Sequence, residues 1–212
     1  SQLAARAGVP VREVRDLAIW GNHSSTQFPD AWHATIGGRL APQVIDDEAW
    51  LQGAFISSVQ QRGAEIIKAR GQSSAASAAN AVIDTVRNVT QPSGEIFSAA
   101  IPAPSSAGYG VPEGLVFGYP LRATAPGTVE IVQGIEHDEF ARSKIEATTA
   151  ELLEETLERD LQRVAERVDE PEALAEVDVA PGTTIRLFEG ASGTVLIGSD
   201  SHAGRFYDDD TA

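Results

Sequence analysis

Three short β-like runs stand between residues 95 and 132, and glycines and prolines separate them rather than helical segments. The runs occupy residues 96–101, 115–124 and 128–132. Because consecutive strands without a helical crossover pair antiparallel, this region predicts a β-meander. Helical patterns lie on both sides of the meander, and helices packed against a largely antiparallel sheet form an α+β domain. A dinucleotide-binding Rossmann fold is not expected, since no G-x-G-x-x-G motif follows a strand in this chain.

Two amphipathic helices are expected before the meander. The first should follow the acidic residues 46–48 and end at Gly71. Its apolar stripe contains Leu51, Phe55, Val59 and Ile66. The second should be capped by Ser73 or Ser74. Its buried face is predicted to contain Ala79, Val82, Ile83 and Val86, which follow the three- and four-residue spacing of a helix.

One long helix is expected after the meander. Asp138 is its predicted N-cap, because a carboxylate there can accept hydrogen bonds from free backbone N–H groups of the first turn. The apolar stripe of this helix contains Ile145, Leu153, Leu157, Leu161, Val164 and Val168. The tryptophans at positions 20, 32 and 50 are expected to add apolar packing area.

A histidine follows the end of a short apolar run. The run ends at Trp20, Gly21 and Asn22 break it, and His23 comes next, at the predicted end of a strand. Histidine can give and take a proton near neutral pH, so this position suits a general acid or base. A hydrogen-bonded structural histidine is the alternative.

Composition excludes several classes of partner and site. The 212 residues include 31 acidic and 16 basic ones, for a net charge of −15, and no basic stripe. We therefore expect no nucleic acid and no membrane surface as partners. No cysteine is present, and the four histidines are not at metal-ligand spacing, so no metal site is expected. His33, His137 and His202 are expected at the surface.

No run of about 18 apolar residues occurs, and no charged-then-apolar leader opens the sequence. We accordingly expect a cytoplasmic protein.

Three collinear blocks resemble the malate dehydrogenases, specifically the cytosolic-type branch. Residues 16–30 contain Gly-Asn-His-Ser-Ser-Thr-Gln followed by an aromatic residue, proline and aspartate. Residues 59–71, Val-Gln-Gln-Arg-Gly-Ala-Glu-Ile-Ile-Lys-Ala-Arg-Gly, continue into the serine- and alanine-rich residues 73–80. Residues 109–114, Tyr-Gly-Val-Pro-Glu-Gly, form the third block. The resemblance covers about residues 1 to 160.

This resemblance implies a function. It implies the carboxyl-terminal catalytic portion of an enzyme that reversibly oxidises (S)-malate to oxaloacetate with NAD, as a homodimer. The family's proton acceptor matches His23, and Ser73 matches a position near the substrate. The family's orienting aspartate and substrate-binding arginine belong to a Leu-Asp-His-Asn-Arg motif upstream of the matched region, and that motif is absent here. By resemblance the chain lacks the NAD-binding domain, so we expect little turnover from it alone.

Other residues near these blocks have competing interpretations. Asn22 is a predicted substrate-binding residue, and with Gly21 it also shapes the turn that presents His23. Ser73 can serve as a plain N-cap as well as bind an anion with nearby backbone N–H groups. Arg62 is expected to be solvated or ion-paired rather than catalytic.

Two other functions compete with the dehydrogenase. A Ser-His hydrolase using Ser24 or Ser25 is disfavoured, because adjacent residues rarely face each other and no nucleophile elbow is present. A non-catalytic dimerisation or binding module, derived from a dehydrogenase half-domain, is the stronger rival.

The predicted domain organisation is a catalytic domain over residues 1–160 and an unassigned acidic extension over residues 161–212. Residues 151–212 carry 16 acidic and 5 basic residues. Within the extension, residues 183–189 and 194–198 predict two short strands of a hairpin.

Overall fold

The computed structural model describes residues 1–72, 75–165, 185–189 and 195–199. The amino-terminal half contains α1 (Gln2–Ala7), the 3₁₀ turn η1 (Val11–Glu13), β1 (Val14–Arg15), β2 (Ala18–Trp20), β3 (Phe28–Asp30), β4 (Thr35–Ile36), β5 (Arg39–Leu40), α2 (Ala41–Ile45), α3 (Glu48–Trp50), the π-helical segment η2 (Leu51–Phe55), α4 (Ile56–Arg70) and α5 (Ala75–Thr90). The remainder contains β6 (Ile96–Pro102), β7 (Val116–Ala125), β8 (Thr128–Ile131), α6 (Glu139–Ala165), β9 (Ile185–Glu189) and β10 (Val195–Ser199).

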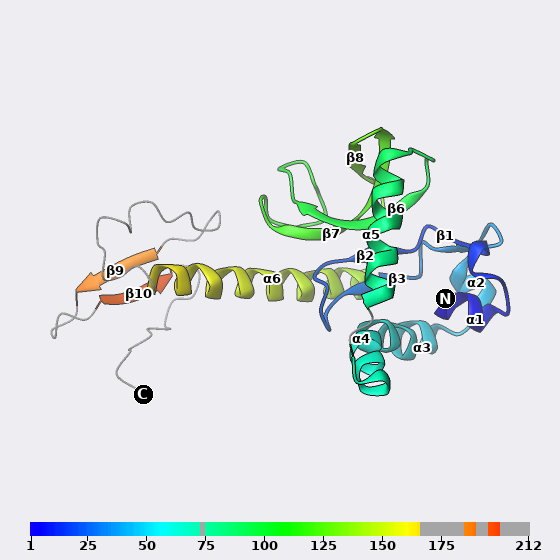
Figure 1. Ribbon diagram of the computed structural model, residues 1–212, viewed down its shortest axis with the longest axis horizontal. Coiled ribbons are helices and arrows are strands. Elements are labelled where there is room, and N and C mark those ends of the chain that lie inside the picture. Colours follow the sequence, from blue (N-terminus) through cyan, green and yellow to red (C-terminus); the bar gives the residue numbers. More distant parts are fainter. Residues whose placement is uncertain (73–74, 166–184, 190–194, 200–212) are drawn as a thin grey trace.

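The predicted meander is confirmed. Strands β6, β7 and β8 form a three-stranded antiparallel sheet in sequential order. In its register Ile101 lies opposite Phe117 and Leu121 lies opposite Ile131. The sheet lies on one side of the β2–β3 hairpin and α6, and α3 and α4 lie on the other (Figure 1). The expected α+β architecture, with helices around antiparallel strands, is therefore correct.

The first predicted helix is present as three consecutive segments. It begins after Asp47, whose carboxylate accepts a hydrogen bond from the Trp50 backbone N–H, and continues through α3, η2 and α4. It ends at the predicted residue, because Gly71 adopts a left-handed φ of 68° that favours glycine.

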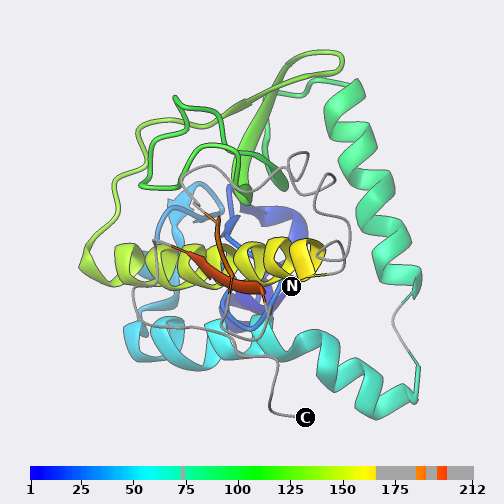
Figure 2. The ribbon, with the colours of Figure 1, turned by 90° about the vertical axis from the view of Figure 1, so that its left-hand side faces the viewer.

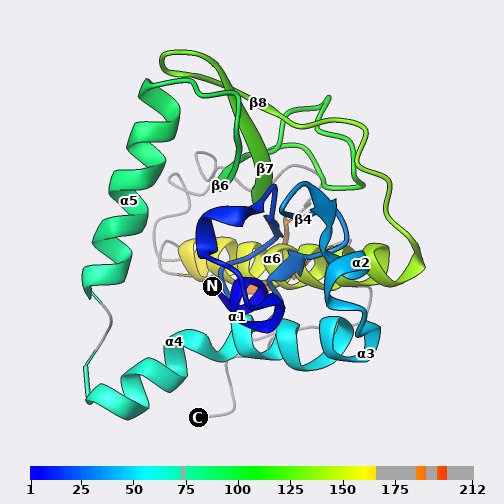
Figure 3. The ribbon, with the colours of Figure 1, turned by 90° about the vertical axis from the view of Figure 1, so that its right-hand side faces the viewer.

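The second predicted helix forms as α5, but its predicted buried face is wrong. Val82, Ile83 and Val86 are 63%, 56% and 56% exposed. The helix contacts β6 and β7 and otherwise stands apart from the rest of the chain along one side of the molecule (Figures 2 and 3). The spacing correctly identified an amphipathic helix, but no described residue covers its apolar face.

The long last helix is confirmed together with its cap. The Ala141 backbone N–H donates to Asp138 Oδ1 at 2.8 Å, one turn before the helix buries Ile145. Its apolar stripe is not buried throughout, because Leu153 is 41% exposed. Figure 1 shows why: the second half of α6 runs beyond the sheet and the hairpin.

The core lies between the meander, the β2–β3 hairpin and the first turns of α6. Its largest fully buried side chains are Trp20, Tyr119, Phe28, Phe55 and Phe117. Trp32 and Trp50 pack against it while partly exposed, so all three tryptophans serve packing as predicted. Among the described helices, none has both the length and the apolar composition to cross a bilayer.

The two strands expected in the carboxyl-terminal extension are present as β9 and β10. Strands β9 and β10 pair antiparallel, with Val195 opposite Glu189 and Ser199 opposite Ile185.

Candidate functional site

The end of β2 is joined to the meander by a close approach of two glycines. Gly21 and Gly118 exchange backbone hydrogen bonds, each with a nitrogen to oxygen distance of 3.0 Å. Gly21 has a φ of 91°, and a Cβ there would lie 2.2 Å from a methyl carbon of Thr148. Only glycine fits between strand and helix at this point, which places the following residues on the surface of α6.

Residues 22–26, which follow this contact, are held by hydrogen bonds to α6. The Asn22 backbone N–H donates to the hydroxyl of the fully buried Thr148 at 2.8 Å. The hydroxyls of Ser24 and Thr26 both donate to Glu151. Burial of Glu151 acts to raise its pKa, but these hydrogen bonds outweigh that effect and lower the pKa. Hydrogen bonds to α6 therefore fix the turn on both sides of residue 23.

The side chain of Asn22 takes part in the same network. Its amide donates to Glu151 at 3.1 Å and to Glu155 at 3.0 Å. The predicted substrate-binding group is therefore bound to α6 in this structure. Thr148, Glu151 and Glu155 could not be linked to the turn from the sequence, because more than 120 residues separate them from it.

The side chain of His23 is exposed to solvent. Within the part of the chain that the structure describes, its imidazole makes no hydrogen bond or ion pair. The structural alternative, a histidine fixed by hydrogen bonds, therefore has no support among the described residues. Chemically, an accessible imidazole on an anchored turn can accept a proton from a substrate hydroxyl.

The other predicted site residues are less informative. Ser73 lies outside the described residues. Arg62 is exposed on α4 and forms no ion pair with the described residues, which agrees with the solvated interpretation.

A second polar cluster lies at the other end of the β2–β3 hairpin. Asp30 is fully buried, and its Oδ2 lies 2.6 Å from His33 Nδ1 and 3.7 Å from His137 Nε2. The prediction that His137 is a surface group is wrong, because its side chain is only 5% exposed. His33 is partly exposed, at 35%, and His202 lies outside the described residues. Asp30 and His33 are three positions apart, but only tertiary packing brings in His137 from more than 100 positions away, so residue spacing gave no signal for the three-residue cluster.

The charges of this cluster stabilise one another. Burial acts to raise the pKa of Asp30, but the two imidazoles outweigh it and lower that pKa to about 2. Conversely, the Asp30 carboxylate raises the pKa of His33 against the opposing effect of burial. A buried carboxylate beside His33 favours its protonated form.

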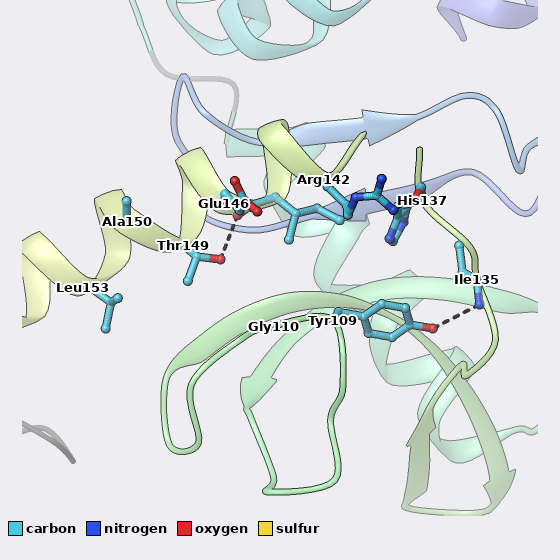
Figure 4. A pocket seen from close by; sticks show the side chains of 10 residues that line it. Tyr109, Gly110, Ile135, His137, Arg142, Glu146, Thr149, Ala150 and Leu153 are labelled. Atoms are coloured by element: carbon cyan, nitrogen blue, oxygen red, sulfur yellow. Dashed lines mark hydrogen bonds between the residues drawn. The ribbon is translucent and has the colours of Figure 1, made fainter. Parts of the chain in front are cut away.

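A cavity of about 520 Å³ lies beside His137, between the start of α6 and the loop before β7. Tyr109, Ile135, Arg142 and Glu146 are among its lining residues (Figure 4). The Tyr109 hydroxyl donates to the Val132 carbonyl and accepts from the Ile135 N–H, which holds the chain segment leading to His137.

Known proteins share this fold and this segment of sequence. Residues 1–161 match the family of the lactate/malate dehydrogenase, alpha/beta C-terminal domain. The chain belongs to the lactate/malate dehydrogenase family, whose members are oxidoreductases.

Solved structures that resemble this chain belong to the same family. Malate dehydrogenase from Naegleria fowleri is 42% identical, with a TM-score of 0.68, over 73% of this chain and 47% of that one. Trichomonas vaginalis lactate dehydrogenase, in complex with NADH and oxamate, is 29% identical, with a TM-score of 0.73, over 78% and 51%. The chain thus spans about half the length of these proteins. Both malate and lactate dehydrogenases are among the structures that resemble it.

Proposed function

We propose that this chain supplies the substrate-binding half of an NAD-dependent malate dehydrogenase, in which His23 accepts the proton of the malate 2-hydroxyl. The observation that carries the proposal is the exposed imidazole of His23 on a turn that α6 holds in place. Among the described residues, this imidazole forms no hydrogen bond or ion pair. Oxidation of malate to oxaloacetate removes the hydroxyl proton and a hydride from the same carbon. His23 would take the proton, and a bound dinucleotide would supply the hydride acceptor.

The preference for malate over lactate rests on sequence similarity. The matched protein with 42% identity is a malate dehydrogenase, and the matched lactate dehydrogenase has 29%. The Gly-Asn-His-Ser-Ser-Thr-Gln segment, which resembles the cytosolic-type branch, contains the proposed base.

Ser73 and Asn22 are proposed as substrate-binding residues. The Asn22 side chain could contact a substrate only by exchanging its bonds to Glu151 and Glu155. We therefore propose that the Asn22 backbone N–H, which donates a hydrogen bond to Thr148, also positions His23.

The dinucleotide does not fit among the described residues. All their strand pairs are antiparallel, whereas a Rossmann site needs parallel strands joined through a helix. NAD is proposed on family grounds, supported by the NADH named in the Trichomonas vaginalis complex, and we assign this chain only the proton-accepting part of the reaction.

A homodimer in the cytoplasm is the proposed working state. The exposed apolar residues of α5 support a partner surface, since Val82, Ile83 and Val86 lie together on one uncovered face.

The test combines this chain with a separately produced NAD-binding half of a malate dehydrogenase. Oxaloacetate-dependent oxidation of NADH is followed by absorbance, with pyruvate as the competing substrate. We expect activity with oxaloacetate, and we expect His23→Ala to lower kcat by roughly 100-fold to 10,000-fold because the general base is lost.

Ser25→Ala is the matched control, because Ser25 is an exposed neighbour on the same turn. Its activity should equal that of the unchanged chain. Full activity of His23→Ala would contradict the proposed role of His23. A well-folded pair without any activity would favour the non-catalytic binding module, and a preference for pyruvate would favour a lactate dehydrogenase.

A further inference from the structure

We propose that Asp30, His33 and His137 bind a divalent transition-metal ion of the Zn²⁺ type, at a site separate from His23. The inference depends only on the geometry of these three side chains, so it stands whether or not the proposed dehydrogenase function is correct.

The three side chains converge on one point. One ligand atom from each, Asp30 Oδ2, His33 Nδ1 and His137 Nε2, lies within 4.8 Å of the other two. Ligand atoms about 2.1 Å from a tetrahedral Zn²⁺ are roughly 3.4 Å apart. The 3.7 Å between His137 and Asp30 is close to that spacing, whereas the 2.6 Å between His33 and Asp30 must widen.

His137 provides an independent indication of a ligand. Its Nε2 is buried and has no hydrogen-bond partner, although it points toward the Asp30 carboxylate. A buried polar atom without a partner costs free energy, and native proteins rarely leave one unsatisfied. A metal ion between Nε2 and Oδ2 would satisfy both atoms.

The surroundings hold the ligands in place. The other carboxylate oxygen of Asp30 accepts a hydrogen bond from the Trp32 backbone N–H at 3.0 Å. The ring of His137 packs edge-on against Trp20, with centroids 4.8 Å apart. Such supporting contacts orient metal ligands and reduce the reorganisation that binding requires.

The donor set selects the kind of ion. Two imidazole nitrogens and one carboxylate oxygen suit Zn²⁺ and similar transition metals, whereas Mg²⁺ and Ca²⁺ prefer oxygen ligands only. His137 also lines the cavity of about 520 Å³, from which a water molecule can complete a four-coordinate shell (Figure 4). On binding, the proton between His33 and Asp30 leaves to solvent and two nitrogen–metal bonds and one oxygen–metal bond form.

The site is distinct from the proposed catalytic residue. Asp30 pairs with Ala18 at the open end of the hairpin, and His23 lies in the turn beyond Trp20 and Phe28 at the other end. A metal here would tie β3 to the segment that leads into α6, because His137 lies two residues before that helix. Its effect would be to stabilise the fold.

The experiment titrates metal-free full-length chain with Zn²⁺ in a calorimeter, without any cofactor or substrate. We expect one Zn²⁺ per chain and a higher Tm in its presence. His137→Gln and His33→Gln should each weaken binding by more than the roughly 10- to 100-fold typical of a lost supporting partner. Co²⁺ should give the visible absorption of a nitrogen- and oxygen-ligated ion, and both variants should lose it.

His23→Gln is the matched control, since it removes an exposed imidazole outside the cluster and should leave Zn²⁺ affinity unchanged. Absence of binding by the unchanged chain would overturn the proposal. Binding that persists in both cluster variants, or that is lost in His23→Gln, would also overturn it. Far-ultraviolet circular dichroism checks folding, and His33→Gln, at a partly exposed position, keeps the test valid if His137→Gln fails to fold.

Discussion

At the scale of single residues, the position of His23 depends on a glycine that tolerates no side chain. Gly21 combines a φ of 91° with a Cβ position occupied by the side chain of Thr148. The sequence identified Gly21 as a strand breaker, but the contact with Thr148 is visible only in the folded chain.

We expect Gly21→Ala to lower the free energy of unfolding by on the order of 3 kcal/mol, because both the backbone strain and the clash with Thr148 must be relieved. Urea unfolding followed by tryptophan fluorescence measures this change. Gly38→Ala is the control for strain alone, since Gly38 also has a positive φ but has open space around its Cβ position. Equal losses in the two variants would show that Thr148 does not restrict residue 21.

The buried carboxylate of Asp30 should make stability depend on acid pH. Its pKa is lowered from 3.8 to about 2 in the folded chain, so the ionised form stabilises the fold above pH 4 and this contribution disappears as the pH falls toward 2. The corresponding free energy is about 2 kcal/mol. The stability gap between the unchanged chain and Asp30→Asn should therefore be largest between about pH 4 and the range in which His33 loses its proton. It should shrink below pH 4, as Asp30 becomes protonated, and also as the pH rises through the raised pKa of His33.

Urea unfolding at several pH values measures this gap. Asp46→Asn is the control, because Asp46 is exposed and asparagine accepts its left-handed φ of 49°. A gap for Asp30→Asn that is independent of pH down to 2.5 would show that the two histidines do not stabilise the Asp30 carboxylate.

At the scale of elements, the helices illustrate what periodicity can and cannot predict. Spacing predicted α4, α5 and α6 and two of their termini, because capping and apolar stripes are local properties. It did not predict which stripes are covered. Ile145 is buried at the start of α6, whereas Ile83 on α5 is exposed, although both lie on apolar stripes.

The uncovered face of α5 can be tested by substitution. For the dilute, monomeric chain we expect Ile83→Gln to change the free energy of unfolding by less than about 0.5 kcal/mol, because the side chain is 56% exposed in one chain. The control Leu51→Ala, at a fully buried position, should cost about 2 to 5 kcal/mol. Thermal or urea unfolding gives both values. A larger loss at concentrations where the chain self-associates would support the proposed homodimer, whereas a large loss in the monomer would contradict the exposure of this face.

At the scale of the whole molecule, the described core belongs to the family-matched part of the chain. The buried apolar residues of the core cluster extend from Leu3 to Ile145, and the family match covers residues 1–161.

A chain that ends at Ala165 should accordingly fold with nearly the Tm of the full-length chain, within about 4 °C, because the described core is retained. Differential scanning calorimetry measures the difference, and a chain that ends at Ile135 is the control that removes Ile145 and should not fold cooperatively. A fall of more than about 8 °C for the longer truncation would place part of the core beyond residue 165.

The candidate site was predictable in part, because some of its features are local in the sequence. His23 could be singled out because the end of a strand, a glycine and a histidine follow one another within a few residues. Thr148 and Glu151, which hold the turn around it, could not be found, since their contacts join positions about 125 residues apart. The burial of His137 could not be predicted, because the burial of a polar side chain depends on what packs over it.

The sequence by itself determined the strands of the meander, the three long helices with two of their termini, and the family, because backbone hydrogen bonding and motif order are local in the chain. Only the tertiary structure decided which apolar faces are covered, where the carboxylates of α6 meet the His23 turn, and that Asp30, His33 and His137 converge. These outcomes depend on packing between distant segments, where burial and charge act through space and leave no pattern in residue spacing.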